Sequence, residues 1–138
     1  IGIGQMASPA PRIKLFDFLT SNGHELGTFQ SSSAIISPSA QIGQGTIIMH
    51  GAIVNASAVI GKNCIINTKA LIEHDCEVGS HCHISTGAIL NGGVKVGSGV
   101  FVGSSAVVKQ GVTIGDGATI KMGEVVTRDV IPDVFRVS

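Results

Sequence analysis

The chain of 138 residues has the length of one domain, and 43% of its residues are hydrophobic, which is enough to bury a core. Nine lysines and arginines balance nine aspartates and glutamates, so the composition supports neither a nucleic-acid partner nor an anionic membrane surface. The sequence lacks a membrane-spanning apolar run and a secretory signal pattern, and its three cysteines argue against a disulfide framework, so we expect a cytoplasmic protein.

The N-terminal residues, 1–33, predict a short strand followed by a helix. The strand is expected over 1–4, and the helix begins at Pro9 or Pro11 and ends near residues 22–23. Its apolar face includes Ile13, Phe16 and Leu19. A G-x-G-x-x-A string at 2–7 is a weak match to a dinucleotide-binding fingerprint, because no complete βαβ unit surrounds it. We expect residues 1–33 to cap the open end of the structure that follows, where strand edges would otherwise be unpaired.

Residues 34–130 repeat a six-residue pattern in which the third residue is always aliphatic. The third positions are Ile36, Ile42, Ile48, Val54, Ile60, Ile66, Ile72, Val78, Ile84, Leu90, Val96, Val102, Val108, Ile114, Ile120 and Val126. Strand alternation directs the first and third residues of each unit to one face and the second to the other. Glycine or asparagine, frequent at the fourth position, predicts a left-handed backbone at each corner. This is an all-β fold, a parallel β-helix of about five coils, followed by a tail at 131–138.

The stretch 67–85 gathers three histidines, acidic residues and two cysteines. The chain's three cysteines occupy first positions and point inward, as core packing: Cys64, Cys76 and Cys82. His83 occupies a second position, and His74 and Asp75 lie at a corner, so these side chains point outward. Inward thiols and outward imidazoles cannot converge on one ion, so no metal site is predicted. The histidine spacing of the zinc-binding γ-class carbonic anhydrases, which share this scaffold, is also absent.

The adjacent pair His74 and Asp75 has the chemistry of a general base and its modulator. Imidazole accepts a proton near neutral pH, and a neighbouring carboxylate stabilises the charged ring. On spacing alone, a solvated corner histidine explains the pair as well. We interpret His24, His50 and His81 as surface polar residues.

The segment "IINTKALIEHDCEVGSHCHISTGAILNGGVKVGSGVFVGSSAVV" resembles one branch of the hexapeptide-repeat acetyltransferases. This branch contains the sialic-acid O-acetyltransferases and the bacterial UDP-amino-sugar N-acetyltransferases. The resemblance implies a left-handed β-helix, usually a homotrimer. It also implies roles for six residues: His74 as general base, Asp75 as its modulator, His83 and Gly92 around the acetyl group, and Gly103 and Ser104 at the coenzyme.

The resemblance further implies an enzyme that moves an acetyl group from acetyl-CoA to an amine or hydroxyl of a sugar or nucleotide-sugar, without a metal. Residues 1–33 resemble only the last strand, the helix and the exit of the N-terminal domain that grips the nucleotide-sugar in that branch. The alternative among enzymes is a different acceptor: an antibiotic, an amino acid or another small molecule. Some hexapeptide acetyltransferases that modify such compounds carry a long loop inside the repeat, which this chain lacks. The alternatives are a non-catalytic structural or binding β-helix and a fragment of a larger acetyltransferase.

Overall fold

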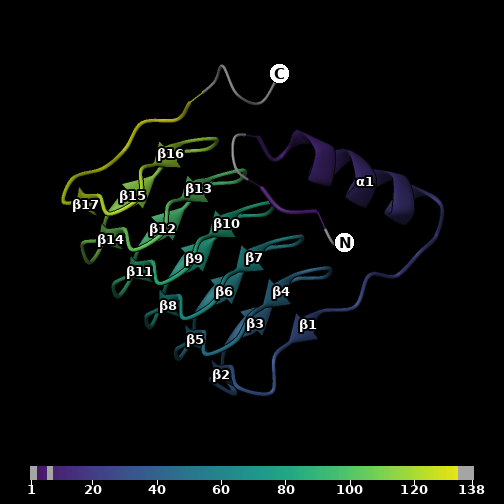
Figure 1. Cartoon of the computed structure of the whole chain (residues 1–138), viewed down its shortest axis with the longest axis horizontal. Coiled ribbons are helices and arrows are strands. Elements are labelled where there is room, and N and C mark those ends of the chain that lie inside the picture. Colours follow the sequence, from purple (N-terminus) through teal and green to yellow (C-terminus); the bar gives the residue numbers. More distant parts are fainter. Residues whose placement is uncertain (1–2, 6–7, 134–138) are drawn as a thin grey trace.

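A computed structural model describes residues 3–5 and 8–133 of the chain (Figure 1). One helix, α1 (Ala10–Ser21), precedes seventeen two-residue strands. The strands are β1 (Phe29–Gln30), β2 (Ile35–Ile36), β3 (Gln41–Ile42), β4 (Ile47–Ile48), β5 (Ile53–Val54), β6 (Val59–Ile60), β7 (Ile65–Ile66), β8 (Leu71–Ile72), β9 (Glu77–Val78), β10 (His83–Ile84), β11 (Ile89–Leu90), β12 (Lys95–Val96), β13 (Phe101–Val102), β14 (Val107–Val108), β15 (Thr113–Ile114), β16 (Thr119–Ile120) and β17 (Val125–Val126).

The strands form three parallel sheets that enclose a triangular coil. Sheet A contains β1, β4, β7, β10, β13 and β16, sheet B contains β2, β5, β8, β11, β14 and β17, and sheet C contains β3, β6, β9, β12 and β15. Partners lie eighteen residues apart in register, as in the pairing of Ile65 with His83. Each turn therefore has three corners, which we call A–B (for example 67–70), B–C (73–76) and C–A (79–82). The predicted left-handed β-helix of about five coils is confirmed.

The first and third residues of the units fill the inside of the coil, as the period predicts, except for Glu124, the first residue of the last unit, which is exposed. From Ile48 to Val126 the third-position side chains are at most 5% exposed. Cys64, Cys76 and Cys82 are at most 1% exposed, which confirms their predicted inward packing. Each buried Val, Leu or Ile contributes about 1.5–3 kcal/mol, so the stack holds together through many branched side chains without large aromatic ones.

The corners differ from the prediction in one respect. The left-handed residue is the sixth of each unit, from Gly45 to Gly123, and not the fourth. It includes residues with side chains such as Asp75 (φ 59°) and His81 (φ 64°). Fourth-position glycines serve a different purpose, because neighbouring turns approach closely there. A Cβ at Gly79 would lie 2.7 Å from backbone atoms of the next turn.

This close approach predicts that Gly79→Ala destabilises the coil by about 1–3 kcal/mol, the usual cost of overpacking. The measurement is the urea midpoint of unfolding followed by circular dichroism. The matched control is Gly27→Ala, because a Cβ at Gly27 meets nothing within 4 Å. Equal midpoints for the two variants would contradict the steric explanation of the fourth position.

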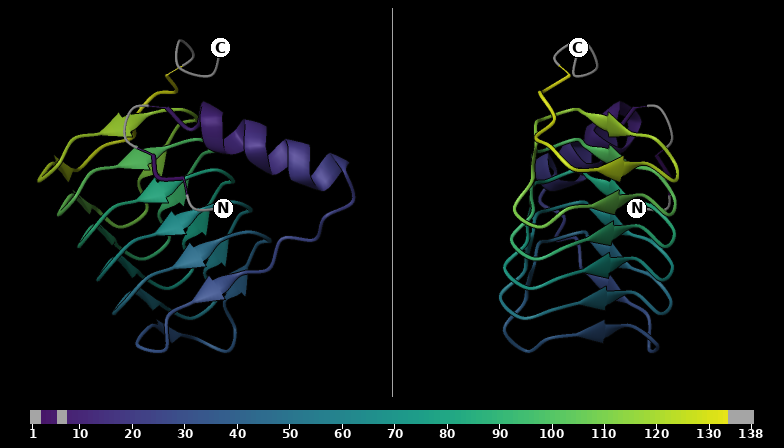
Figure 2. Two further views of the ribbon diagram at one scale, coloured as in Figure 1. Left: turned by 45° about the vertical axis from the view of Figure 1, so that its right-hand side comes forward. Right: turned by 90° about the vertical axis from the view of Figure 1, so that its left-hand side faces the viewer.

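Helix α1 begins and ends within a residue or two of the prediction, but it lies along the side of the coil (Figure 2). It crosses successive turns at the C–A corner, with Phe16 near Gly45 and Arg12 near His81. We expected residues 1–33 to cap an open end; helix α1 instead packs along the side of the coil through Phe16 and Arg12, the buried residues of the helix. Ile3 and Gly4 are not in a strand, and residues 1–2 lie outside the described residues.

The coil itself begins before residue 34, because β1 already pairs with β4. Among the described residues, no helix is both long enough and apolar enough to cross a membrane.

Candidate active site

His74 and Asp75 form a hydrogen-bonded pair at the B–C corner. His74 Nδ1 lies 2.8 Å from Asp75 Oδ2, and the two side chains are 58% and 67% exposed. A carboxylate only accepts, so Nδ1–H donates and Nε2 carries the lone pair. The left-handed backbone at Asp75 turns its carboxylate back towards the preceding residue. In the neutral ring, this arrangement leaves Nε2 as the proton acceptor, on a side chain that is 58% exposed.

Gly92 lies directly against the His74 ring in the next turn. A Cβ at Gly92 would be 2.7 Å from both Cε1 and Nε2 of His74. A side chain there would displace the imidazole, so glycine is required for the ring to lie over this turn. We use the term base corner for His74, Asp75 and Gly92.

His83 points away from the coil axis, as predicted, but it is only 8% exposed because Gln5 covers it. Its Nδ1–H donates to the Gln5 backbone carbonyl at 2.8 Å. Its Nε2 lies 3.0 Å from Nδ2 of Asn67, whose Oδ1 accepts from the backbone N–H of Thr68. The Phe101 ring packs edge-on at 5.3 Å. Burial lowers the pKa of His83, the hydrogen bond to the Gln5 carbonyl opposes this shift, and the Arg12 charge adds to it. The pKa therefore lies below the ordinary histidine value, so the imidazole is neutral at pH 7.

A groove of about 540 Å³ runs past His83 over sheet A and the A–B corner. It is lined by Gln5, His83, Ser85, Phe101, Gly103, Ser104, Lys121 and Met122. Ser104 Oγ and Ser85 Oγ are hydrogen-bonded at 3.0 Å. At Gly103 two neighbouring turns approach closely, because a Cβ there would lie 2.5 Å from the Met122 backbone nitrogen. We call this space the sheet A groove.

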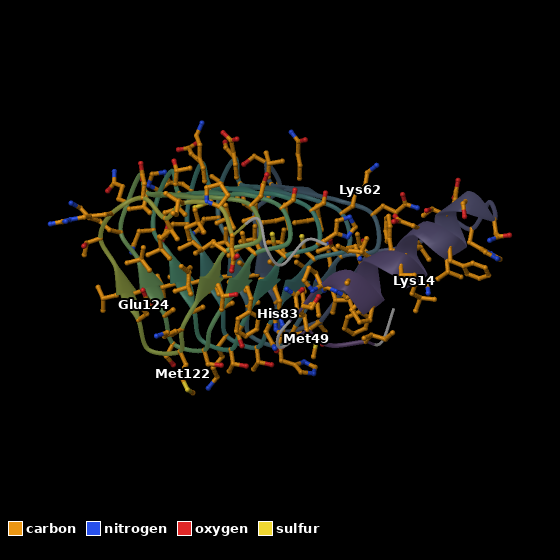
Figure 3. All side chains as sticks on the ribbon, turned by 90° about the horizontal axis from the view of Figure 1, so that it is seen from above. Lys14, Met49, Lys62, His83, Met122 and Glu124 are labelled. Atoms are coloured by element: carbon orange, nitrogen blue, oxygen red, sulfur yellow. The ribbon has the colours of Figure 1, made fainter. Side chains whose placement is uncertain are left out.

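A second space of about 320 Å³ shares His83 and extends towards Asn67 and Met49. Figure 3 shows His83 between Met49 and Met122, which mark the two spaces. His83 therefore separates a groove towards the later turns from one towards the earlier turns.

The structure gathers the six predicted site residues into two groups. His74, Asp75 and Gly92 belong to the base corner, whereas His83, Gly103 and Ser104 line the sheet A groove. Sheet B lies between the B–C corner and the A–B corner. One chain therefore presents the two groups at opposite edges of the same sheet.

Three residues of this site were not found from the sequence. Asn67 occupies a fourth position, where the pattern indicated only a corner. Gln5 and Arg12 lie outside the repeat, where no period predicts direction. Arg12 is 1% exposed, and its Nη2 lies 2.7 Å from Gln5 Oε1.

The interpretation of His81 as a surface polar residue was wrong. Its ring packs edge-on against Phe16 at 5.6 Å, and its Nδ1 lies 2.9 Å from Asn63 Nδ2. Burial lowers the pKa of His81. By contrast, His24 and His50 are exposed.

The lowered pKa values of His81 and His83 predict a loss of stability in acid. The unfolded chain binds protons at these residues from about pH 6.5 downwards, whereas the folded chain resists protonation. The stabilisation is therefore complete above pH 6.5 and falls as the pH drops towards the folded pKa values. Melting temperatures between pH 7.5 and pH 5 should fall less steeply in His81→Gln/His83→Gln. The control His24→Gln should keep the wild-type slope, and an unchanged slope in the double variant would contradict the assignment.

Within residues 3–5 and 8–133, no group of three or more His, Cys, Asp or Glu side chains is placed to hold a metal ion.

Family models match most of the repeat. A model described as bacterial transferase hexapeptide (six repeats) matches residues 33–73 and 57–92. A model described as hexapeptide repeat of succinyl-transferase matches residues 93–128. Comparison with curated protein sequences gave no match.

Solved structures extend the similarity beyond the repeat. Perosamine N-acetyltransferase from Caulobacter crescentus, in complex with CoA and GDP-perosamine, is 38% identical with a TM-score of 0.90, over 94% of this chain and 61% of that one. The acetyltransferase domain of PglB from Neisseria gonorrhoeae, in complex with acetyl coenzyme A, is 33% identical with a TM-score of 0.89, over 91% and 62%. WeeI from Acinetobacter baumannii is 29% identical with a TM-score of 0.88, over 94% and 63%.

The chain thus spans less than two thirds of the length of each of these structures. The repeat models, the coil and the similarity of 38% and 33% to two acetyltransferases agree with the resemblance predicted from the sequence motifs. The chain belongs to the bacterial hexapeptide-repeat transferases.

Proposed function

We propose that this protein transfers an acetyl group from acetyl-CoA to an amine or hydroxyl of a nucleotide-linked sugar, with His74 as the general base. The observation that carries the proposal is the pair of His74 Nδ1 and Asp75 Oδ2 at 2.8 Å, with the Nε2 side of the ring lying against Gly92. The solved relatives with CoA, acetyl coenzyme A and GDP-perosamine support the choice of donor and acceptor class.

In this reaction His74 Nε2 removes the proton that the acceptor loses as its nitrogen or oxygen attacks the thioester carbonyl. The imidazolium that forms keeps its Nδ1–H on the Asp75 carboxylate, which stabilises the positive charge. The proton then passes to the departing sulfur of coenzyme A, and the acetyl group stays on the acceptor. The buried cysteines take no part, because they are at most 1% exposed.

The sheet A groove is the proposed donor site. Its volume of about 540 Å³ lies within the usual range of small-molecule pockets, about 300–1,000 Å³. Gly103 and Ser104 line this groove, and Ser104 offers a hydroxyl to a ligand there. His83 is a buried lining residue of this groove, and we assign the acetyl end of the donor to its neighbourhood.

The active form is a homotrimer, and the outer face of sheet B supports this part of the proposal. All six outward residues of that sheet are aliphatic: Ile35, Ile53, Leu71, Ile89, Val107 and Val125. The two terminal members are 65% and 68% exposed. Three copies with sheet B facing a threefold axis would cover this face. They would also bring the base corner of one protomer to the A–B corner of the next, next to the sheet A groove.

The test is a transfer assay with radiolabelled acetyl-CoA and a panel of nucleotide-linked sugars that carry a free amine or hydroxyl. We expect label on at least one acceptor, with release of free coenzyme A in equal amount. Acetyl-CoA binding without transfer to any member of the panel would contradict the acceptor class. If the protein neither binds acetyl-CoA nor transfers its acetyl group, the proposal as a whole is contradicted.

A further inference from the structure

His83 is joined to helix α1 by a closed set of hydrogen bonds that the proposed reaction does not itself require. Gln5 connects the two, since its backbone carbonyl accepts from His83 Nδ1 at 2.8 Å and its side-chain Oε1 accepts from Arg12 Nη2 at 2.7 Å. Arg12 Nη2 also donates to the backbone carbonyl of His81 at 2.9 Å. Arg12 therefore holds both Gln5 and the strand entrance that carries His83.

The same contacts determine which nitrogen of His83 carries the proton. A backbone carbonyl can only accept, so Nδ1 must be protonated. Independently, Asn67 Oδ1 accepts from the Thr68 N–H at 2.7 Å, which directs the Asn67 NH₂ towards Nε2 at 3.0 Å. Nε2 therefore accepts. Two separate contacts give the same tautomer.

We propose that Gln5 is a positioning residue for the donor site: tied to Arg12, it holds His83 as the neutral Nδ1–H tautomer and so fixes the His83–Asn67 pair beside the acetyl group. The inference rests on the proposed function, because it assigns a purpose to His83 in the sheet A groove. Gln5 is 3% exposed and Arg12 is 1% exposed, so neither exchanges readily with water. Without the Gln5 side chain, Arg12 no longer holds residue 5 in the position from which its backbone carbonyl accepts from His83 Nδ1.

The experiment measures the imidazole ¹⁵N signals of His83 by NMR in the whole chain, assigned by their absence from His83→Asn. At pH 7.5 the wild type should show a protonated Nδ1 and an unprotonated Nε2. In Gln5→Ala the Nδ1–H tautomer should persist, because Asn67 still donates to Nε2, but the Nδ1 signal should shift as its hydrogen bond to the residue 5 carbonyl weakens. The Kd of this variant for acetyl-CoA should rise roughly threefold to tenfold, the usual worth of one hydrogen bond. Gln5→Glu keeps an oxygen for Arg12 and should restore both properties.

The matched control is Gln41→Ala, because Gln41 is exposed on sheet C, away from both groups of site residues. A protonated Nε2 in the wild type overturns the proposal, and so does an Nδ1 signal that is unchanged in Gln5→Ala. If Gln5→Ala does not fold, the proposal is tested by the wild-type tautomer and by the acetyl-CoA affinity of Gln5→Glu, which should match that of the wild type. If the wild type does not bind acetyl-CoA, the proposed function fails. The NMR signals of His83 still test the hydrogen-bond geometry in that case.

Discussion

His74→Ala is expected to lower kcat for acetyl transfer by about 10²–10⁴, the usual contribution of a positioned general base. The loss should appear in kcat and not in acetyl-CoA affinity, since the sheet A groove does not contain His74. The fold should be unaffected, because the side chain is 58% exposed and its structural contact with the next turn uses the backbone carbonyl. The measurement is steady-state kinetics with the best acceptor from the panel.

The matched control for this variant is His24→Ala, which removes an exposed histidine outside the repeat. It should retain wild-type kcat. Full activity in His74→Ala would show that another group removes the proton. The hydrogen bond between His74 and Asp75 would then have no part in catalysis.

Ile89→Asp is expected to prevent trimer formation and, with it, nearly all transfer activity. Ile89 lies in the middle of the aliphatic outer face of sheet B, and a carboxylate buried there without a partner is unfavourable by several kcal/mol. The folded chain should persist, because the inward side chains of β11 are unchanged. Light scattering should give three copies for the wild type and one for the variant.

The control is Val59→Asp, which places the same carboxylate at the equivalent outward position of sheet C. Val59 is 40% exposed, and this variant should remain a trimer. An active monomeric wild type would contradict the shared site, because one chain presents the base corner and the sheet A groove at opposite edges of sheet B. A trimer that survives Ile89→Asp but not Val59→Asp would place the interface on sheet C.

The sequence predicted the repeat well because each third position obeys one requirement, a branched apolar side chain, and all sixteen satisfy it. Direction within the repeat follows from position, which is why the cysteines were placed inside and His74 outside. The corner backbone was assigned to the wrong position because glycine has two uses. At Gly79 it avoids a clash between turns, whereas left-handed conformations fall on residues such as Asp75 and His81.

The environment of His83 could not be predicted in the same way. It depends on contacts between residues 69 and 78 positions apart, such as Arg12 with His81 and Gln5 with His83. No local pattern encodes where helix α1 lies against the coil. For the same reason, the burial of Arg12 could not be predicted, since a charged residue in a short helix predicts an exposed side chain.

The most direct test of the central claim is a calorimetric titration of the purified chain with acetyl-CoA, because it requires no knowledge of the acceptor. The account predicts binding in the micromolar range with one coenzyme per protomer, weakened in His83→Ala and unchanged in His24→Ala. If the wild type does not bind, or if His83→Ala binds with wild-type affinity, the assignment of the sheet A groove as a donor site is contradicted.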